Sequence, residues 1–180
     1  MPGPLHVEVE PWGPDPDVAE AAARAALERP AVKAELGGAQ ARLVAVQPLD
    51  GDDDAPAGAV RATVYDYAAE RALLVDVPLE GGGAPVLASS AHQPLPSAGE
   101  REAAIAIVRE DAELGLALRD GRLEPYRAMP PLLEEELPDG TVERTVTVGL
   151  RPADGEDGHE IVGVRLARGE VVRFDGGAPA

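Results

Sequence analysis

The sequence predicts an α+β protein of two tandem units, each a helix packed on a curled antiparallel sheet. Two observations carry this expectation. An alanine-rich helical stretch is followed by four alternating, valine-rich segments, and a similar order returns after the proline-bearing residues 91–97. We therefore expect an N-terminal extension at residues 1–14, a first unit at 15–94 and a second unit at 95–180.

The first unit opens with strong helix-start signals. Asp15 is a good N-cap, Pro16 suits the first helical position, and Asp17 complements the helix dipole. Pro30 interrupts the helix, and the glycines at 37–38 end it. The positions expected to face the sheet are Val18, Ala22, Ala25, Val32 and Leu36.

Four strands are expected to follow this helix. Their residues alternate, are rich in valine, and are separated by turn clusters at 50–54 and 81–83. The expected strands are 42–48, 60–67, 72–79 and 85–92. A shorter alternating run at 5–10 suggests an additional edge strand in the N-terminal extension.

The second unit repeats the order. Ser97 and Glu100 have the spacing of a capping box, in which each side chain satisfies a free amide at the helix start. The helix is expected to continue through Ile105, Val108, Leu114 and Leu118, and to end at 120–121. The strands expected after it are 122–128, 141–150, 160–166 and 170–174.

The two halves also align without gaps at an offset of 82 residues. Pro48 then matches Pro130, and Thr63-Val64 matches Thr145-Val146. Identities are few, so the alignment is a hint of duplication. A helix across four antiparallel strands is the layout of the cystatin fold.

Composition excludes several classes of function. The formal net charge of −17 disfavours nucleic acid and anionic membranes as partners. The absence of cysteine excludes disulfides and thiolate metal sites. No apolar run approaches the roughly 20 residues that span a bilayer, and the first residues lack the features of a signal peptide, so we expect a cytoplasmic protein.

Four runs resemble a known family. They are VRATVYDY (60–67), ALLVDVPLEGG (72–82), HQPLPSAGE (92–100) and AIVREDAEL (106–114). This succession resembles the small N-terminal domains of copper amine oxidases, which come as a tandem pair of cystatin-like units. The resemblance covers residues 60–125 at the level of motifs, and most of the chain by order of elements.

The resemblance does not extend to the oxidase chemistry. That family builds its quinone from a tyrosine in an Asn-Tyr-Asp/Glu context, and this chain has no asparagine before Tyr65 or anywhere else. Its copper site needs a His-x-His pair, which His6, His92 and His159 do not form. The resemblance therefore implies a non-catalytic protein without cofactor or metal.

Other candidate sites have simpler explanations. His6, Glu8 and Glu10 share one strand face, as a metal site or as the polar face of an edge strand. Asp50, Asp52 and Asp54 mimic a calcium loop, but Ala55 stands where such a loop needs glycine. We therefore expect a solvated edge and a solvated turn.

Three further motifs favour ordinary structure. Ser90 and His92 share a strand face, but no nucleophile motif such as Gly-x-Ser-x-Gly accompanies them. The glycines at 81–83 lack the Lys-Ser/Thr of a phosphate loop and predict a hairpin turn. The glutamates at 134–136 indicate a solvated connector.

Three aromatic residues are the candidates for partner binding. Tyr65 and Tyr67 are expected on one strand face, where they either pack in the core or between sheets, or contact a partner. Trp12 lies between two prolines, where it either caps the core or anchors a partner.

Three hypotheses for function remain. The first is an interaction or assembly module, acting through a protein partner or self-association. The second, motivated by the net charge of −17, is an acidic module for a cationic small molecule or a basic peptide. The third is an enzyme using paired carboxylates, which no spacing in the sequence singles out.

Overall fold

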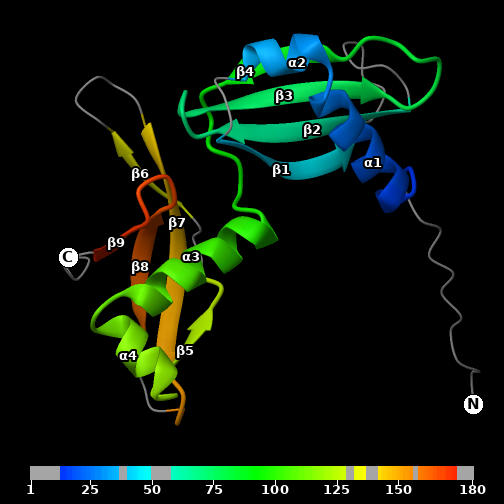
Figure 1. The fold of residues 1–180 in the computed structure, drawn as a ribbon. Helices are drawn as coiled ribbons and strands as arrows, with labels where there is room; N and C mark the ends of the chain where they lie inside the picture. The colour runs from blue at the N-terminus through cyan, green and yellow to red at the C-terminus, as the bar shows by residue number, and fades with distance from the viewer. Residues whose placement is uncertain are drawn as a thin grey trace, which may run out of the picture.

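The structure, a computed structural model, describes residues 13–36, 40–49, 58–128, 132–136, 142–155 and 158–173. It is an α+β protein in which helices and antiparallel sheets alternate twice along the chain (Figure 1). The predicted strand at 5–10 and Trp12 lie outside the described residues.

The first half contains two helices and one four-stranded sheet. Its elements are α1 (Pro16–Leu27), α2 (Pro30–Glu35), β1 (Ala41–Pro48), β2 (Ala59–Asp66), β3 (Arg71–Pro78) and β4 (Val86–Ser90). Neighbouring strands pair antiparallel in the order β1-β2-β3-β4. Asp15 caps α1, as expected, because its carboxylate accepts from the backbone amides of Asp17 and Val18.

The predicted rotation of α1 is wrong by about one residue. Ala19, Ala23 and Ala26 are buried against the sheet, whereas Val18 is 56% exposed and Ala25 is exposed. The expected stripe of residues and the buried one have similar helical spacing, and both consist mainly of alanine. The hydrophobic pattern therefore does not determine which face of α1 packs on the sheet.

The second half again places two helices before its strands, but its sheet has five strands instead of the four expected. Its elements are α3 (Ala98–Glu110), α4 (Leu114–Arg119), β5 (Leu123–Tyr126), β6 (Leu132–Glu136), β7 (Val142–Pro152), β8 (Glu160–Arg165) and β9 (Glu170–Arg173). Helix α3 contacts β7, β8 and β9, and α4 contacts β5. The side chain of Ser97 and that of Glu100 form the predicted capping box at the start of α3.

The predicted connector at 134–136 is wrong, because these residues belong to strand β6. Strand β7 pairs with β5 at its residues 149–152, with β6 at 142–146, and with β8 at 145–150. Both β5 and β6 therefore lie on the side of β7 opposite β8. A run of glutamates has a low strand propensity, but its backbone hydrogen-bonds to β7 regardless of side chain, and charge is tolerated at a sheet edge.

The predicted continuous helix from 97 to 119 is also wrong, because it breaks at Asp111. The Asp111 carboxylate accepts from the backbone amides of Glu113 (3.0 Å) and Leu114 (2.9 Å), and α4 begins there. The turn is tight. A Cβ built on Gly115 would lie 2.2 Å from the carbonyl oxygen of Arg109, so only glycine fits.

Two apolar cores lie between the helices and their sheets. Valines of β2 and β3 pack under α1, and valines of β7 and β8 pack under α3. A smaller cluster of Val44, Tyr65, Tyr67 and Ala72 lies on the other face of the first sheet, and Leu166 of the second half packs against it. This contact brings the halves together. Within the described part of the chain, no helix is long and apolar enough to cross a membrane.

Candidate functional site

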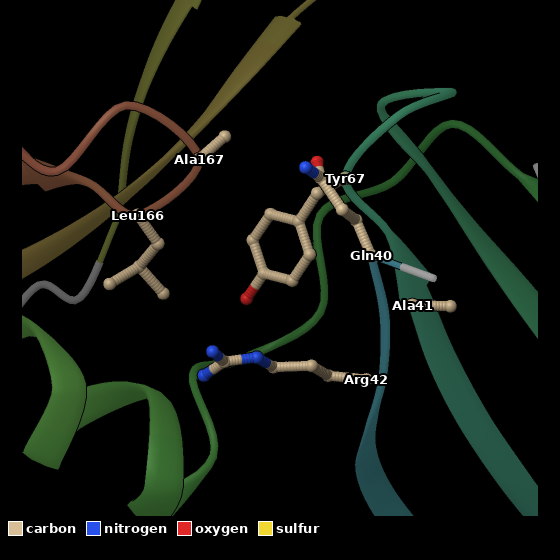
Figure 2. Close-up of a pocket in the computed structure, with 6 residues that line it drawn as sticks. All are labelled: Gln40, Ala41, Arg42, Tyr67, Leu166 and Ala167. Carbon is tan, nitrogen blue, oxygen red and sulfur yellow. The ribbon is translucent and has the colours of Figure 1, made fainter. Parts of the chain in front are cut away.

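The halves meet around Tyr67, which lies in the turn after β2. A cavity of about 300 Å³ opens beside it. Its lining comes from three segments: Gln40, Ala41 and Arg42 at the start of β1, Tyr67 itself, and Leu166 and Ala167 after β8. The Arg42 side chain extends toward the hydroxyl end of the Tyr67 ring, with its Cζ 6.0 Å from the ring centroid (Figure 2). The cavity therefore has walls from both halves.

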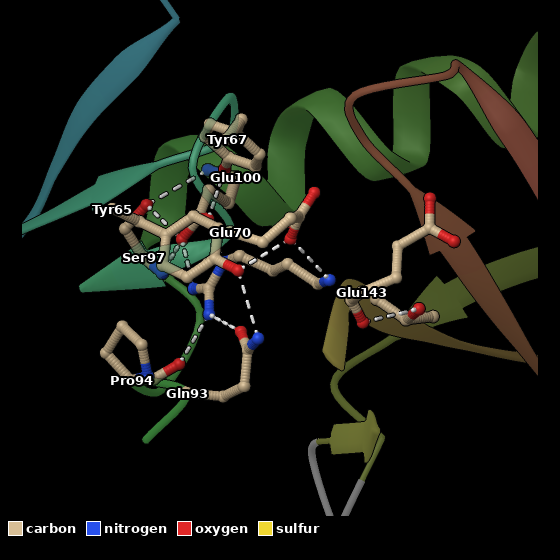
Figure 3. Close-up of polar contacts among 10 residues, drawn as sticks. Tyr65, Tyr67, Glu70, Gln93, Pro94, Ser97, Glu100 and Glu143 are labelled. Atoms are coloured by element: carbon tan, nitrogen blue, oxygen red, sulfur yellow. Dashed lines mark hydrogen bonds and ion pairs between the residues drawn. The ribbon is translucent and has the colours of Figure 1, made fainter. Parts of the chain in front are cut away.

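Behind Tyr67 lies a buried ion pair between Arg144 and Glu100. Arg144 Nε donates to Glu100 Oε1 at 2.6 Å, and Nη2 donates to Oε2 at 2.9 Å. Figure 3 shows Glu100 among the polar contacts that also involve Tyr67 and Ser97. Both side chains have 0% relative exposure. Strand β7 supplies the arginine and the first turn of α3 supplies the carboxylate, so the pair fixes α3 on its own sheet. This two-point geometry is the strongest that a guanidinium and a carboxylate adopt.

The first half joins this pair through two tyrosines. The Tyr67 hydroxyl donates to Glu100 Oε1, and the Arg144 guanidinium carbon lies 4.6 Å from the centroid of the Tyr65 ring. The two rings contact each other edge to face, with centroids 5.0 Å apart. Both residues are buried, Tyr65 at 1% exposure and Tyr67 at 8%. Because both residues are shielded from solvent, the cation–π contact of Arg144 with the Tyr65 ring adds to the attraction between the halves.

The turn after β2 and the segment joining the halves complete the network. Tyr65 Oη donates to Glu70 Oε2 at 2.8 Å, and the same carboxylate oxygen accepts from the backbone amide of Arg144 at 3.2 Å. Gln93 donates from Nε2 to Tyr65 Oη at 3.0 Å and accepts from Arg144 Nη1 at 3.1 Å. Arg144 Nη1 also donates to the carbonyl of Pro94 at 2.8 Å. The arginine thus bonds to the first half, the connecting segment and α3.

The electrostatics of the network hold its members in fixed protonation states. Burial acts to raise the pKa of Glu100, but hydrogen bonds from Arg144 and Tyr67 outweigh it and lower that pKa. Burial opposes the charge of Arg144, yet the bonds to Glu100 raise its pKa. Burial, then the hydrogen bonds to Glu70 and Glu100, raise the pKa of Tyr65 and of Tyr67. The carboxylate and guanidinium stay charged and the phenols stay neutral.

A second ionic cluster lies beside the first. The buried carboxylate of Glu143 is 2.8 Å from Arg168 Nε and 3.1 Å from Arg165 Nε, and Arg165 also bonds to Glu170 at 3.1 Å. These pairs fix β7 to β8 and to the turn that carries Leu166 and Ala167. The cavity wall formed by Leu166 and Ala167 is therefore held in place.

The residues singled out in the sequence have different fates. Tyr65 and Tyr67 take part in the junction network, in agreement with packing between the sheets. Trp12, His6, Glu8 and Glu10, and the acidic residues 50–54 all lie outside the described residues.

Two further motifs are described. Ser90 Oγ accepts from the backbone amide of His92 at 3.1 Å, which is a local turn contact of two exposed or half-exposed residues. Gly81 and Gly82 have φ values of 77° and 62°, which agrees with the predicted hairpin turn. Among the described residues, no group of three or more histidine, aspartate or glutamate side chains is arranged to hold a metal ion.

The sequence does not indicate Arg144 as a site residue, and it predicts Glu100 only as a helix cap. One signal was present: Glu143 and Arg144 are adjacent charges inside a stretch that otherwise has the pattern of a buried strand. Charged residues are rarely buried unless they are paired.

No family model matches the sequence, and no curated protein matches it either.

Proposed function

We propose that the chain is a non-catalytic interaction or assembly module, built of two cystatin-like units and similar to the small N-terminal domains of copper amine oxidases. Helices on antiparallel sheets in both halves support the cystatin-like part of the proposal. The bonding of Arg144, Glu100, Tyr65 and Tyr67 to one another, away from solvent, supports a structural role for the residues with shifted pKa values.

The observation that carries the proposal is the free edge of strand β4. Among the described strands, β4 pairs only with β3, so its other edge is open. The strand contains valine, leucine, alanine and two serines, and so has no charged side chain. Val86 is 57% exposed and Ala88 is exposed. Natural edge strands usually carry charges or proline that block pairing, and an edge without them is a template for an added strand.

A second copy of the chain is the first partner to test. Two β4 edges related by a twofold axis pair antiparallel with each other. The net charge of −17 repels another copy over long distances, so the measurement belongs near 150 mM salt, where the Debye length is about 8 Å.

Light scattering coupled to size exclusion tests the proposal. Wild type is expected to associate reversibly with concentration, and Ala88→Lys is expected to remain monomeric because it places a charge on the edge. Ala25→Lys adds the same charge on the exposed face of α1 and is expected to associate like wild type. A wild type that stays monomeric at all concentrations and does not change with Ala88→Lys contradicts pairing through β4.

A second function has support from a groove in the second half. Its volume is about 820 Å³, and its floor consists of apolar residues of α4, β5 and the adjoining segments. Glu113, Asp154 and Glu160 line it together with Arg122, and Arg173 lies 3.0 Å from the Glu113 carboxylate and 3.8 Å from that of Glu160. Leu116 in the floor is 49% exposed. Apolar lining residues beside three carboxylates favour a basic peptide with apolar side chains, whose arginine would compete with Arg173 for Glu113 and Glu160.

Calorimetry distinguishes this second function from the first. An arginine- and leucine-containing peptide is expected to release heat at low salt, and the double variant Glu113→Gln, Glu160→Gln is expected to bind more weakly. The double variant Glu20→Gln, Glu28→Gln removes two exposed carboxylates of the first half and serves as the control. Equal weakening by both double variants means general charge attraction, and that result contradicts a site in the groove.

A further inference from the structure

The cavity beside Tyr67 has the size and position of a small-ligand site. Its volume of about 300 Å³ falls at the lower end of the range for such sites. It also lies where the two halves meet, which is a common position for a ligand site. The first half supplies residues 40–42 and Tyr67, and the second half supplies Leu166 and Ala167 (Figure 2).

The charge of the cavity is opposite to that of the chain. Arg42 is exposed, and within the described ranges no carboxylate forms an ion pair with it. The carboxylates of the junction already have partners: Glu100 binds Arg144, and Glu143 lies against Arg165 and Arg168. Although the chain has a net charge of −17, the charged side chain that lines this cavity is the guanidinium of Arg42. A planar guanidinium suits a carboxylate, which it binds through two hydrogen bonds.

Apart from Arg42 and the polar side chain of Gln40, the lining residues offer apolar surface to the cavity. The Tyr67 hydroxyl is already bonded to Glu100, so Tyr67 lines the cavity with its aromatic ring. Leu166 packs against the tyrosine cluster, and Ala167 follows it. These walls suit an aliphatic or aromatic group about the size of one amino-acid side chain.

We propose that this cavity binds a carboxylate carried on a small apolar body, with Arg42 holding the carboxylate and Tyr67 and Leu166 contacting the body. Two sources share this chemistry: a free acid such as an acylated amino acid, and the C-terminal residue of a peptide. The inference rests on the cavity alone and does not depend on pairing through β4.

Chemical-shift mapping of the full chain tests the proposal with four probes. They are N-acetyl-leucine, its amide, and a short peptide ending in leucine with either a free or an amidated C-terminus. The two free acids are expected to shift the backbone signals of Gln40, Tyr67 and Leu166, with affinities near the millimolar range, which corresponds to about −4 kcal/mol. The amides are expected to bind at least about 10-fold more weakly, because they lack the charge that Arg42 pairs with.

Variants assign the binding to Arg42. Arg42→Gln is expected to weaken binding about 10-fold or more, since it removes the charge but keeps a hydrogen-bonding amide. Arg24→Gln, which removes an exposed arginine of α1, is expected to bind like wild type. If Arg42→Gln fails to fold, the comparison of acid with amide on wild type still decides the question.

Several results overturn the proposal. The first is the absence of chemical-shift changes at about 10 mM probe. The second is that the amides bind as tightly as the acids, and the third is that Arg42→Gln and Arg24→Gln lose equal affinity for the acids. If N-acetyl-leucine and the peptide with a free C-terminus bind equally well, a small acid is sufficient for binding. If only the peptide binds, the ligand of the cavity is the C-terminus of a peptide. Both of these last outcomes support the carboxylate site.

Discussion

Arg144 and Glu100 form a two-point ion pair, at 2.6 Å and 2.9 Å, in a place where neither side chain reaches solvent. The first half meets this pair through Tyr65, Tyr67 and Glu70. The two halves of the chain therefore share a buried polar network in addition to their separate apolar cores. The stability of each half should depend on the other.

Replacing Arg144 by alanine is expected to destabilise the protein by about 3–5 kcal/mol, because it leaves the buried carboxylate of Glu100 without its partner. Urea unfolding measures the loss. Arg151→Ala is the matched control, since Arg151 lies on the same strand but pairs with Glu124 at the surface, and its loss is expected to cost less than about 1 kcal/mol. Equal midpoints for Arg144→Ala and Arg151→Ala contradict the assignment.

Acid is expected to weaken the junction through Glu100. The folded state lowers the pKa of this carboxyl below its ordinary value of 4.5, so its stabilisation is complete above that value and is lost as the pH falls through the lower, folded pKa. Glu100→Gln should therefore be less stable at neutral pH and show a smaller fall in stability between about pH 6 and pH 3. Glu124→Gln, at the surface, should keep the wild-type slope, and a wild-type slope in Glu100→Gln argues against the assignment.

Tyr65 and Tyr67 are expected to resist ionisation. Burial, followed by hydrogen bonds to carboxylates, raises the pKa of each phenol above the ordinary value of 10. Each neutral phenol therefore contributes to the free energy of unfolding in full below pH 10, and this contribution is lost as the pH rises from 10 toward the higher, folded pKa. Difference absorbance between wild type and Tyr65→Phe or Tyr67→Phe isolates each phenol. A phenol that ionises near 10 in the folded chain shows that it is not buried beside its carboxylate.

Two glycine substitutions test the turn between α3 and α4. Gly115→Ala is expected to destabilise by about 1–3 kcal/mol, because the new Cβ meets the backbone of Arg109. Gly99→Ala has open space within α3 and is expected to stabilise by up to about 1 kcal/mol through helix propensity. Thermal unfolding compares the two. A shift of the same sign for both variants contradicts the close approach at Gly115.

Local signals predicted most elements of this fold. Ser97 and Glu100 are three residues apart, and their capping box was readable from that spacing alone. The strands followed from alternation, since each buried face repeats every second residue. The rotation of α1 was not readable, because alanine occupies both candidate stripes. Strand β6 was missed because its pairing with β7 depends on backbone bonds to a distant segment.

The junction was beyond the reach of local signals. Glu100 and Arg144 are 44 residues apart, and no local sequence pattern around either residue predicts that the two will pair. The sequence indicates Tyr65 and Tyr67 as candidates either for packing or for contact with a partner. Only the arrangement of the two sheets decides between these uses, because it places the tyrosines against the second half.

The most direct test is hydrogen exchange at amides of β3 in the first sheet and β8 in the second, in wild type and in Arg144→Ala. If the buried network joins the halves, the slowest amides of both sheets in wild type report one common opening free energy. Arg144→Ala then separates them into two different values. Two separate values already present in wild type, unchanged by the substitution, would show that the halves are stable independently and that the network does not couple them.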